Sequence, residues 1–290
     1  MSGAVVLSSL ANGVMLGGLY ALVALGLTLI FGVMKIINFA HGALMMWAMY
    51  ASFWLAKLGG VDPYLSLLLT LPLGFAVGYG IQRAVITPVL EAPEHNQLLM
   101  TLGLALFLEN LALLTFKADP RTLLVPYSQA SLSLGPVLLS APRLLAFAGA
   151  LAVTLLLFLF LKFTDLGKAL RAAAEERDGA ALVGIPVRQV YAVAFGIGTA
   201  CVTAAGAMAV PFFYVSPEVG NTFVITAFVV VVLGGMGSFG GALAGGLLVG
   251  IVESLGGLFV HGSLAQIGIF ALFILVLLFR PSGLLGTSSA

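Results

Sequence analysis

The first charged side chain of this chain is Lys35, and uncharged apolar windows about 20 residues long recur from there almost to the C-terminus. A helix of about 20 apolar residues spans the roughly 30 Å hydrocarbon core of a bilayer. Only 8% of the 290 residues are charged, whereas about a quarter are charged in a soluble domain. The chain therefore has too little polar surface for a soluble globule, and the sequence predicts an all-α, polytopic integral membrane protein.

The predicted spans fill most of the chain. We expect about 8–10 transmembrane helices in one domain covering residues 1–290, with spans at 10–33, 39–57, 64–84, 97–116, 143–163, 189–211, 221–236, 241–260 and 264–279. The span at 221–236 is short and ends in a glycine-rich turn, which is typical of either a full crossing or a re-entrant helix. The apolar stretch at the N-terminus is also long enough to include a short interfacial helix before the first span.

The distribution of Lys and Arg predicts the orientation, because cytoplasmic loops carry an excess of cations. With the N-terminus outside, eight of the 12 cations lie inside, namely Lys35, Arg83, Lys162, Lys168, Arg171, Arg177, Arg188 and Arg280. The other four, Lys57, Lys117, Arg121 and Arg143, lie outside. Most of this bias comes from residues 164–188, which are therefore predicted to be cytoplasmic. The formal net charge of +1 gives no preference for nucleic acid, and Cys201 is the single cysteine, which excludes an intramolecular disulfide.

Two polar breaks occupy corresponding places in the two halves of the chain. Asn38–Gly42 follows the first predicted span, and Ser216–Asn221 follows the sixth. Five crossings separate the breaks, so two units built around them would have opposite orientations. Inverted repeats with broken helices are typical of transporters. The pattern is equally compatible with such a repeat and with a chain that has none.

Residues 164–188 form the most polar segment, between the long apolar stretches 144–161 and 190–211. Thr164 or Asp165 is a suitable N-cap for a helix rich in alanine and leucine. We expect Gly179 to interrupt this helix and Gly184-Ile185-Pro186 to end it.

A polar helix between two spans is typical of a docking element for a soluble partner. We expect its alanine face to enter a groove of that partner, while Arg171 and Asp178 make charged contacts at the rim. The alternative is a solvated loop that only fixes the topology.

Three stretches of the chain are similar to one known family. Residues 164–185, T-D-L-G-K-A-L-R-A-A-A-E-E-R-D-G-A-A-L-V-G-I, resemble the coupling segment of LivH-type permeases, the membrane subunits of bacterial ABC importers for branched-chain amino acids. The stretch from Asn12 to Gly42 and the stretch Val231–Ser238 are also similar to that family, in the expected order. The resemblance implies a type II ABC importer-like fold and an inner-membrane location.

The resemblance also implies the partners and the coupling residues. The partners are a second related permease subunit, two ATP-binding subunits and an external substrate-binding protein. This chain would bind no cofactor or metal and catalyse no reaction, because ATP and Mg²⁺ would bind to the partner subunits. Consistently, the sequence has no G-x-x-x-x-G-K-[ST] phosphate-binding loop. The implied ATPase-coupling residues are Thr164, Gly167, Lys168, Arg171, Ala172, Ala173, Glu176, Asp178, Gly184 and Ile185.

Polar residues within or beside the spans are candidates for the translocation path. Asn38 and His41 lie at the first break, where a gate, an ATPase-facing contact, a substrate site and a helix cap are all compatible with the sequence. Glu109, its neighbour Asn110, and Glu253 lie inside predicted spans, where a carboxylate usually lines a pathway or satisfies a structural hydrogen bond. Near the external mouth, Glu218 and Asn221 are interpreted as solvated surface, with contact to the binding protein as the alternative.

Small residues recur at intervals of four along the eighth predicted span. They form two stripes, Gly237, Gly241 and Gly245 in one and Gly246, Gly250 and Ser254 in the other. Such stripes allow helix backbones to approach closely in lipid. We expect packing within the chain, with a seam between subunits as the alternative.

Two rival functions follow from other classes of membrane protein. An ion-coupled secondary transporter of small polar solutes would also have inverted repeats, but the two acids within spans give it thin support. An intramembrane hydrolase is nearly excluded, because the sequence has neither H-E-x-x-H nor G-x-S-x-G. The residues do not distinguish a leucine-type amino acid from another amino acid, urea or an amide as the substrate. The pairing of two copies or of this chain with a relative is likewise open, although the family implies a mixed pair.

Overall fold

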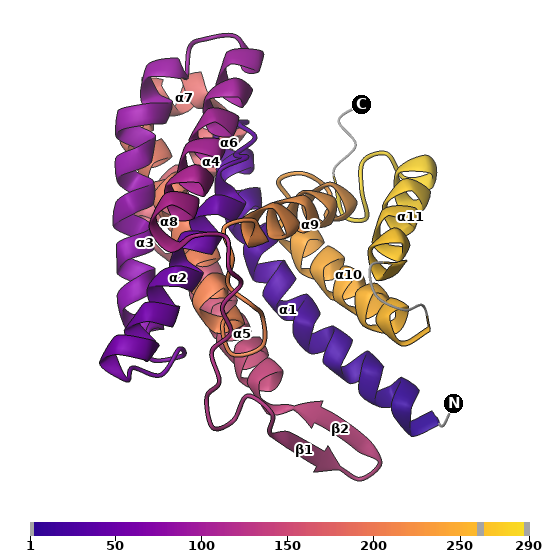
Figure 1. Ribbon diagram of the computed structural model, residues 1–290. Coiled ribbons are helices and arrows are strands. Elements are labelled where there is room, and N and C mark those ends of the chain that lie inside the picture. The colour runs from indigo at the N-terminus through magenta and orange to yellow at the C-terminus, as the bar shows by residue number, and fades with distance from the viewer. Residues whose placement is uncertain (1–2, 260–263, 287–290) are drawn as a thin grey trace.

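A computed structural model of the protein describes residues 3–259 and 264–286 (Figure 1). The elements are α1 (Gly3–Met34), α2 (His41–Gly59), α3 (Leu67–Ile81), η1 (Gln82–Ile86), η2 (Thr87–Val89), α4 (Glu94–Phe116), β1 (Ser131–Leu134), β2 (Val137–Ser140), α5 (Ala141–Phe163), α6 (Asp165–Glu175), α7 (Arg177–Leu182), α8 (Val187–Ala209), α9 (Val219–Gly234), α10 (Phe239–Phe259) and α11 (Leu264–Phe279). A helix lies at each of the nine predicted spans. Six helices in the described part are long and apolar enough to cross a bilayer, which confirms the polytopic all-α class.

The central element is α1, which runs obliquely through the molecule and contacts α5, α8, α9 and α10 (Figure 1). It is one continuous helix from Gly3 to Met34, and no separate interfacial helix precedes the first span within the described residues. The stretch contains no proline that would break it. Most side chains of α1 and α8 are buried, whereas α3, α4 and α5 keep large apolar side chains exposed. An exposed apolar surface of this kind suits lipid.

A β-hairpin between α4 and α5 was not predicted. Ser131 pairs with Ser140 and Leu134 with Val137, and Gly135 adopts a left-handed φ of 61° in the turn. The hairpin is fastened to the first turns of α1, because the Leu138 N–H donates to the Ser8 hydroxyl at 2.9 Å. In Figure 1 it lies at the opposite end of the molecule from α6 and α7.

The two halves of the bundle pack in a reciprocal way. A Cβ atom at Gly26 of α1 would lie 2.5 Å from the Gly198 carbonyl oxygen, and one at Gly198 of α8 would lie 2.6 Å from the Gly26 carbonyl oxygen. Helix α3 packs on α8 as α10 packs on α1, and α2 packs on α9. Mutual contacts of this kind are the signature of a twofold relation. The arrangement therefore supports the predicted repeat, with α1–α2–α3 corresponding to α8–α9–α10.

The glycines of α10 fall into two groups. Gly241 and Gly245 lie against the backbone of α9, and Gly246 and Gly250 lie against Ala21 and Gly17 of α1. Both stripes thus pack within the chain, and neither forms an open seam. Gly237 differs from the expectation, because it precedes α10 in a turn with φ of 87° and makes no close helix contact.

Candidate functional site

The polar segment 164–188 folds into α6 and α7 at the end of the bundle opposite the hairpin (Figure 1). The Thr164 hydroxyl oxygen accepts a hydrogen bond from the Gly167 N–H at 3.0 Å, which satisfies an amide that the first helical turn leaves free. The structure therefore selects Thr164 over Asp165 as the N-cap. Asp165 instead pairs with Lys168 at 2.9 Å, and this hydrogen bond lowers the pKa of Asp165.

The break between α6 and α7 is at Glu176, three residues before the predicted interruption at Gly179. Glu176 has an extended backbone, with φ of −150° and ψ of 105°, and its carboxylate accepts from the Asp178 N–H at 3.3 Å. The side chain of Glu176 thus caps α7, and Gly179 lies inside that helix. The predicted end is in place, because Gly184 has φ of 86° and the Ile185 N–H donates to the Ala180 carbonyl.

The alanine face of α6 was expected to face a partner, but it faces the chain's own bundle. Ala173 is 3% exposed and packs with Leu170 and Gly167 against the chain's own bundle, and Ala172 is half-buried there. The most exposed large apolar side chains of the segment are instead Leu182 and Val183, which are 88% and 77% exposed. Sequence reasoning missed these two because both match the apolar periodicity that usually indicates a buried helix face. Leu182 and Val183 are therefore accessible on the outer surface of this segment, whereas Ala173 is not.

Helix α6 is fixed to the end of α5 by two close contacts. The Arg171 guanidinium donates to the Leu161 carbonyl, so this exposed cation lies at the C-terminal end of α5. At Gly167, a Cβ atom would lie 2.5 Å from the carbonyl oxygens of both Phe160 and Leu161. Since only glycine permits this approach, α6 and the end of α5 are positioned to move together.

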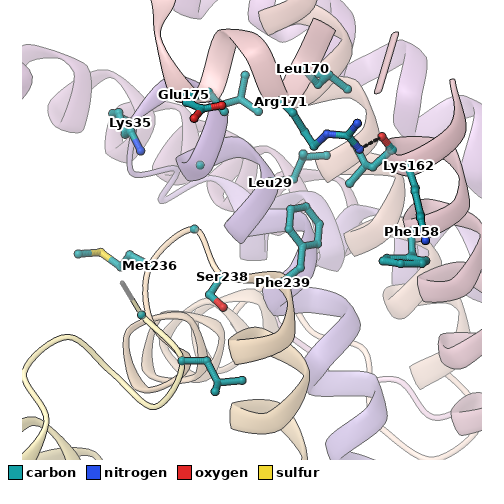
Figure 2. A pocket seen from close by; sticks show the side chains of 17 residues that line it. Leu29, Lys35, Phe158, Lys162, Leu170, Arg171, Glu175, Met236, Ser238 and Phe239 are labelled. Atoms are coloured by element: carbon teal, nitrogen blue, oxygen red, sulfur yellow. Dashed lines mark hydrogen bonds between the residues drawn. The ribbon is translucent and has the colours of Figure 1, made fainter. Parts of the chain in front are cut away.

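A hollow of about 600 Å³ lies beneath α6. Figure 2 shows Arg171 and Glu175 of α6 on one side of it and Met236 and Ser238 of the α9–α10 turn on the other. Lys35, just after α1, also lines it. The end of α1 and the α9–α10 turn therefore lie at the same end of the bundle as α6.

The break at Asn38–Gly42 lies in the interior of the molecule. Residues 35–40 fold back from the end of α1, and His41 Nε2 lies 3.0 Å from the Val23 carbonyl oxygen. Val23 is 11 residues before the end of α1, which is about 16 Å along its axis. Helix α2 therefore begins inside the bundle. The N-terminus of α9 meets it there, because a Cβ atom at Gly42 would overlap the Gly220 carbonyl oxygen.

The burial of this break excludes one expectation. Asn38 and His41 are fully buried, so neither makes an ATPase-facing contact. The Asn38 side-chain oxygen accepts from the Ala40 N–H at 3.1 Å and shapes the turn before α2. Among the described residues, Asn38 Nδ2 and His41 Nδ1 have no hydrogen-bond partner. This leaves two unsatisfied polar atoms where the two helices start.

Glu109 and its neighbour Asn110 have different hydrogen-bond partners. Both Glu109 carboxylate oxygens accept from Asn221 Nδ2, at 3.1 and 3.2 Å. Asn110 instead donates to the Leu106 carbonyl of its own helix. The Glu109–Asn221 pair lines a second hollow, of about 610 Å³, at the hairpin side of α9. No signal in the sequence connects these two residues, which are 112 positions apart.

Glu253 is separate from these groups. It lies half-buried on α10 and lines neither hollow described above. Its neighbour Ser254 bonds to Ser9 of α1. Within residues 3–259 and 264–286, no cluster of His, Cys, Asp and Glu is suited to hold a metal ion.

Comparison with known proteins gives a consistent set of similarities. A family model described as "Branched-chain amino acid transport system / permease component" matches residues 9–277. The chain is 34% identical over 293 residues to the high-affinity branched-chain amino acid transport system permease protein BraD of Pseudomonas aeruginosa, with 97% of this chain and 95% of that protein covered. It is 33% identical over 297 residues to the corresponding protein LivH of Escherichia coli K12, with the same coverage. A probable LivH from Methanocaldococcus jannaschii is 30% identical, over 96% of this chain and 91% of that protein. No solved structure matches the chain.

Proposed function

Since the chain belongs to the family of permease components of branched-chain amino acid transport systems, we propose that it forms part of the translocation path of an ATP-driven importer for branched-chain or similar amino acids. It is a multi-pass protein of the inner membrane. The comparisons support this function and not the ion-coupled alternative.

The proposed assembly has four kinds of component. This chain and a second related permease form the path, two ATP-binding subunits bind ATP and Mg²⁺ at the cytoplasmic face, and an external binding protein delivers the amino acid. The whole chain acts as one permease domain and catalyses no reaction itself. Residues 164–188 are its coupling segment.

The observation that carries this proposal is the two-sided character of the coupling segment. Its inner face, including Leu170 and Ala173, packs on the bundle, where α6 contacts α1, α5 and α8. Its outer surface presents Leu182 and Val183 together with charged side chains. Such a helix can receive a push from a soluble subunit and pass it to the bundle.

A chain of contacts connects α6 to the break at Asn38–Gly42. Helices α1 and α8 cross at Gly26 and Gly198, and His41 contacts α1 three residues before this crossing. Displacing α6 with the end of α5 therefore shifts the helices that hold the α2 and α9 N-termini together. We propose that separation at Gly42 and Gly220 opens the path, with Asn38 and His41 as gate residues. Allosteric coupling of this kind requires two arrangements of the bundle with different affinity for the ATP-bound subunits.

Reversing the charge at Arg171 tests the coupling. In Arg171→Glu, the Leu161 carbonyl loses its donor and a negative charge lies at the C-terminal end of α5. We expect ATP-dependent leucine uptake into proteoliposomes to fall at least about tenfold, within the usual range of allosteric coupling. Arg171→Lys, which keeps the positive charge, should fall less. Membrane insertion and the yield of the complex should not change; full uptake by Arg171→Glu would contradict the proposal.

A further inference from the structure

The hollow at the hairpin side of α9 has the composition of a cation-binding site. Three of its lining residues are Glu109, Glu218 and Ser216, and its apolar wall includes Leu113, Pro120 and Pro217. All three polar side chains offer oxygen acceptors. Ala118 and Pro120, from the loop after α4 that is predicted to be external, also line the hollow.

In the described part of the chain, neither Glu109 nor Glu218 forms an ion pair within 4.0 Å. Glu109 lies about 10 Å along α4 from the end of that helix, where an ionised carboxylate needs a polar partner. Its partner, Asn221, supplies only a neutral amide. The two ion pairs found in the described part of the chain, Lys168–Asp165 and Arg188–Glu91, both lie at the α6–α7 end. Glu109 and Glu218 therefore retain free acceptor capacity and a charge of the same sign.

Ser216 provides an independent indication of a ligand. It is only 7% exposed and lines the hollow, yet in the described ranges its hydroxyl has no hydrogen-bond partner. This hydroxyl is accessible from the hollow, so it can donate to or accept from a group bound there.

We propose that this hollow is the entry site for the transported amino acid and that Glu109 and Glu218 receive its α-ammonium group. This inference rests on the proposed function. An ammonium group has three N–H donors, which match two carboxylates and one hydroxyl. Its hydrogen bonds to carboxylates are charge-assisted, and such bonds are stronger than those between neutral groups. The aliphatic side chain lies along the wall formed by Leu113, Pro120 and Pro217. The carboxylate of the amino acid faces away from Glu109 and Glu218, because all three groups are negatively charged.

A cysteine reporter separates this inference from the transport function. Thr222 lines the hollow and is exposed, whereas the natural Cys201 is buried. In the purified complex carrying Thr222→Cys, the rate of labelling by a membrane-impermeant maleimide reports occupancy. The probes are isopentylamine, which is leucine without its carboxylate, and 4-methylpentanoate, which is leucine without its amine. Sodium chloride at the same concentration is the control for an inorganic cation.

We expect isopentylamine to slow labelling and 4-methylpentanoate and sodium chloride not to. Adding Glu109→Gln or Glu218→Gln should raise the amine concentration needed by about tenfold, as expected for loss of a charge-assisted bond. Asp119 is an exposed acid in the loop after α4 and does not line the hollow, so Asp119→Asn should have no effect. Because the Glu218 side chain is exposed and makes no hydrogen bond within the described ranges, its variant remains informative even if Glu109→Gln folds poorly.

The alternative outcomes are distinct. Equal protection by 4-methylpentanoate or sodium chloride, no protection by the amine, or unchanged protection in both Glu variants would overturn the ammonium site. Leucine uptake that persists with no amine protection overturns this inference alone. Amine protection in a complex that imports no amino acid overturns the proposed function and leaves the hollow as an amine-binding site.

Discussion

Gly42→Ala is expected to lower the melting temperature of the purified protein by at least about 5 °C, the shift that corresponds to roughly 2 kcal/mol in a chain of this size. The added Cβ atom would overlap the Gly220 carbonyl oxygen, which belongs to the backbone at the start of α9. A backbone atom cannot rotate away as a side chain can, so the two helices must separate. Overpacking costs about 1–3 kcal/mol even where neighbours can adjust.

Gly103→Ala is the matched control, and it is not expected to lower the melting temperature. Gly103 lies within α4, and no atom of the part of the chain that the structure describes is within 4 Å of the position of an added Cβ. Since alanine favours a helix by about 1 kcal/mol over glycine, Gly103→Ala should leave the melting temperature unchanged or raise it. Equal melting temperatures for the two variants, measured in the same detergent, would show that the α2 and α9 N-termini do not meet as described.

Gly167→Ala is expected to uncouple ATP hydrolysis from uptake. Its Cβ atom would lie 2.5 Å from the carbonyl oxygens of Phe160 and Leu161, so α6 must move off the end of α5. We expect uptake by the reconstituted complex to fall at least about tenfold, while ATP hydrolysis continues without stimulation by the loaded binding protein. Insertion should be retained, because no apolar span changes.

The control for this variant lies in the same segment. At Gly179, the nearest atom to an added Cβ is the Glu176 Cγ at 3.1 Å, which belongs to a flexible exposed side chain. Gly179→Ala should therefore keep uptake within about twofold of the native rate. Normal coupling in Gly167→Ala would contradict a rigid link between α6 and α5.

The sequence predicted the spans well, because a helix in lipid must be apolar over a length that the bilayer sets. It also predicted where the helix after Thr164 begins and where the segment ends at Gly184, since a cap and a left-handed glycine are local signals. The break at Glu176 escaped prediction because no local rule marks it; Gly179 is the stronger breaker by propensity, yet it fits inside α7.

The contacts between distant segments were beyond sequence reasoning. The sequence marks Asn38–Gly42 as the end of a helix, but the path of the chain back along α1 depends on tertiary packing. The same holds for Glu109, whose partner Asn221 comes from another helix. The direction of the alanine face was wrong for a related reason. Small residues suit close packing on either side of a helix, and only the bundle decides which side is buried.

The coupling segment gives the account its most direct test. Leu182→Cys places a thiol on a side chain that is 88% exposed in α7, and Leu58→Cys places one that is 79% exposed at the end of α2, on the predicted external side. With a short bismaleimide applied to the assembled complex, we expect position 182 to cross-link to an ATP-binding subunit and position 58 not to. No cross-link from position 182, or labelling of position 182 by an impermeant reagent added only from outside, would contradict the proposal that residues 164–188 couple the permease to ATP hydrolysis.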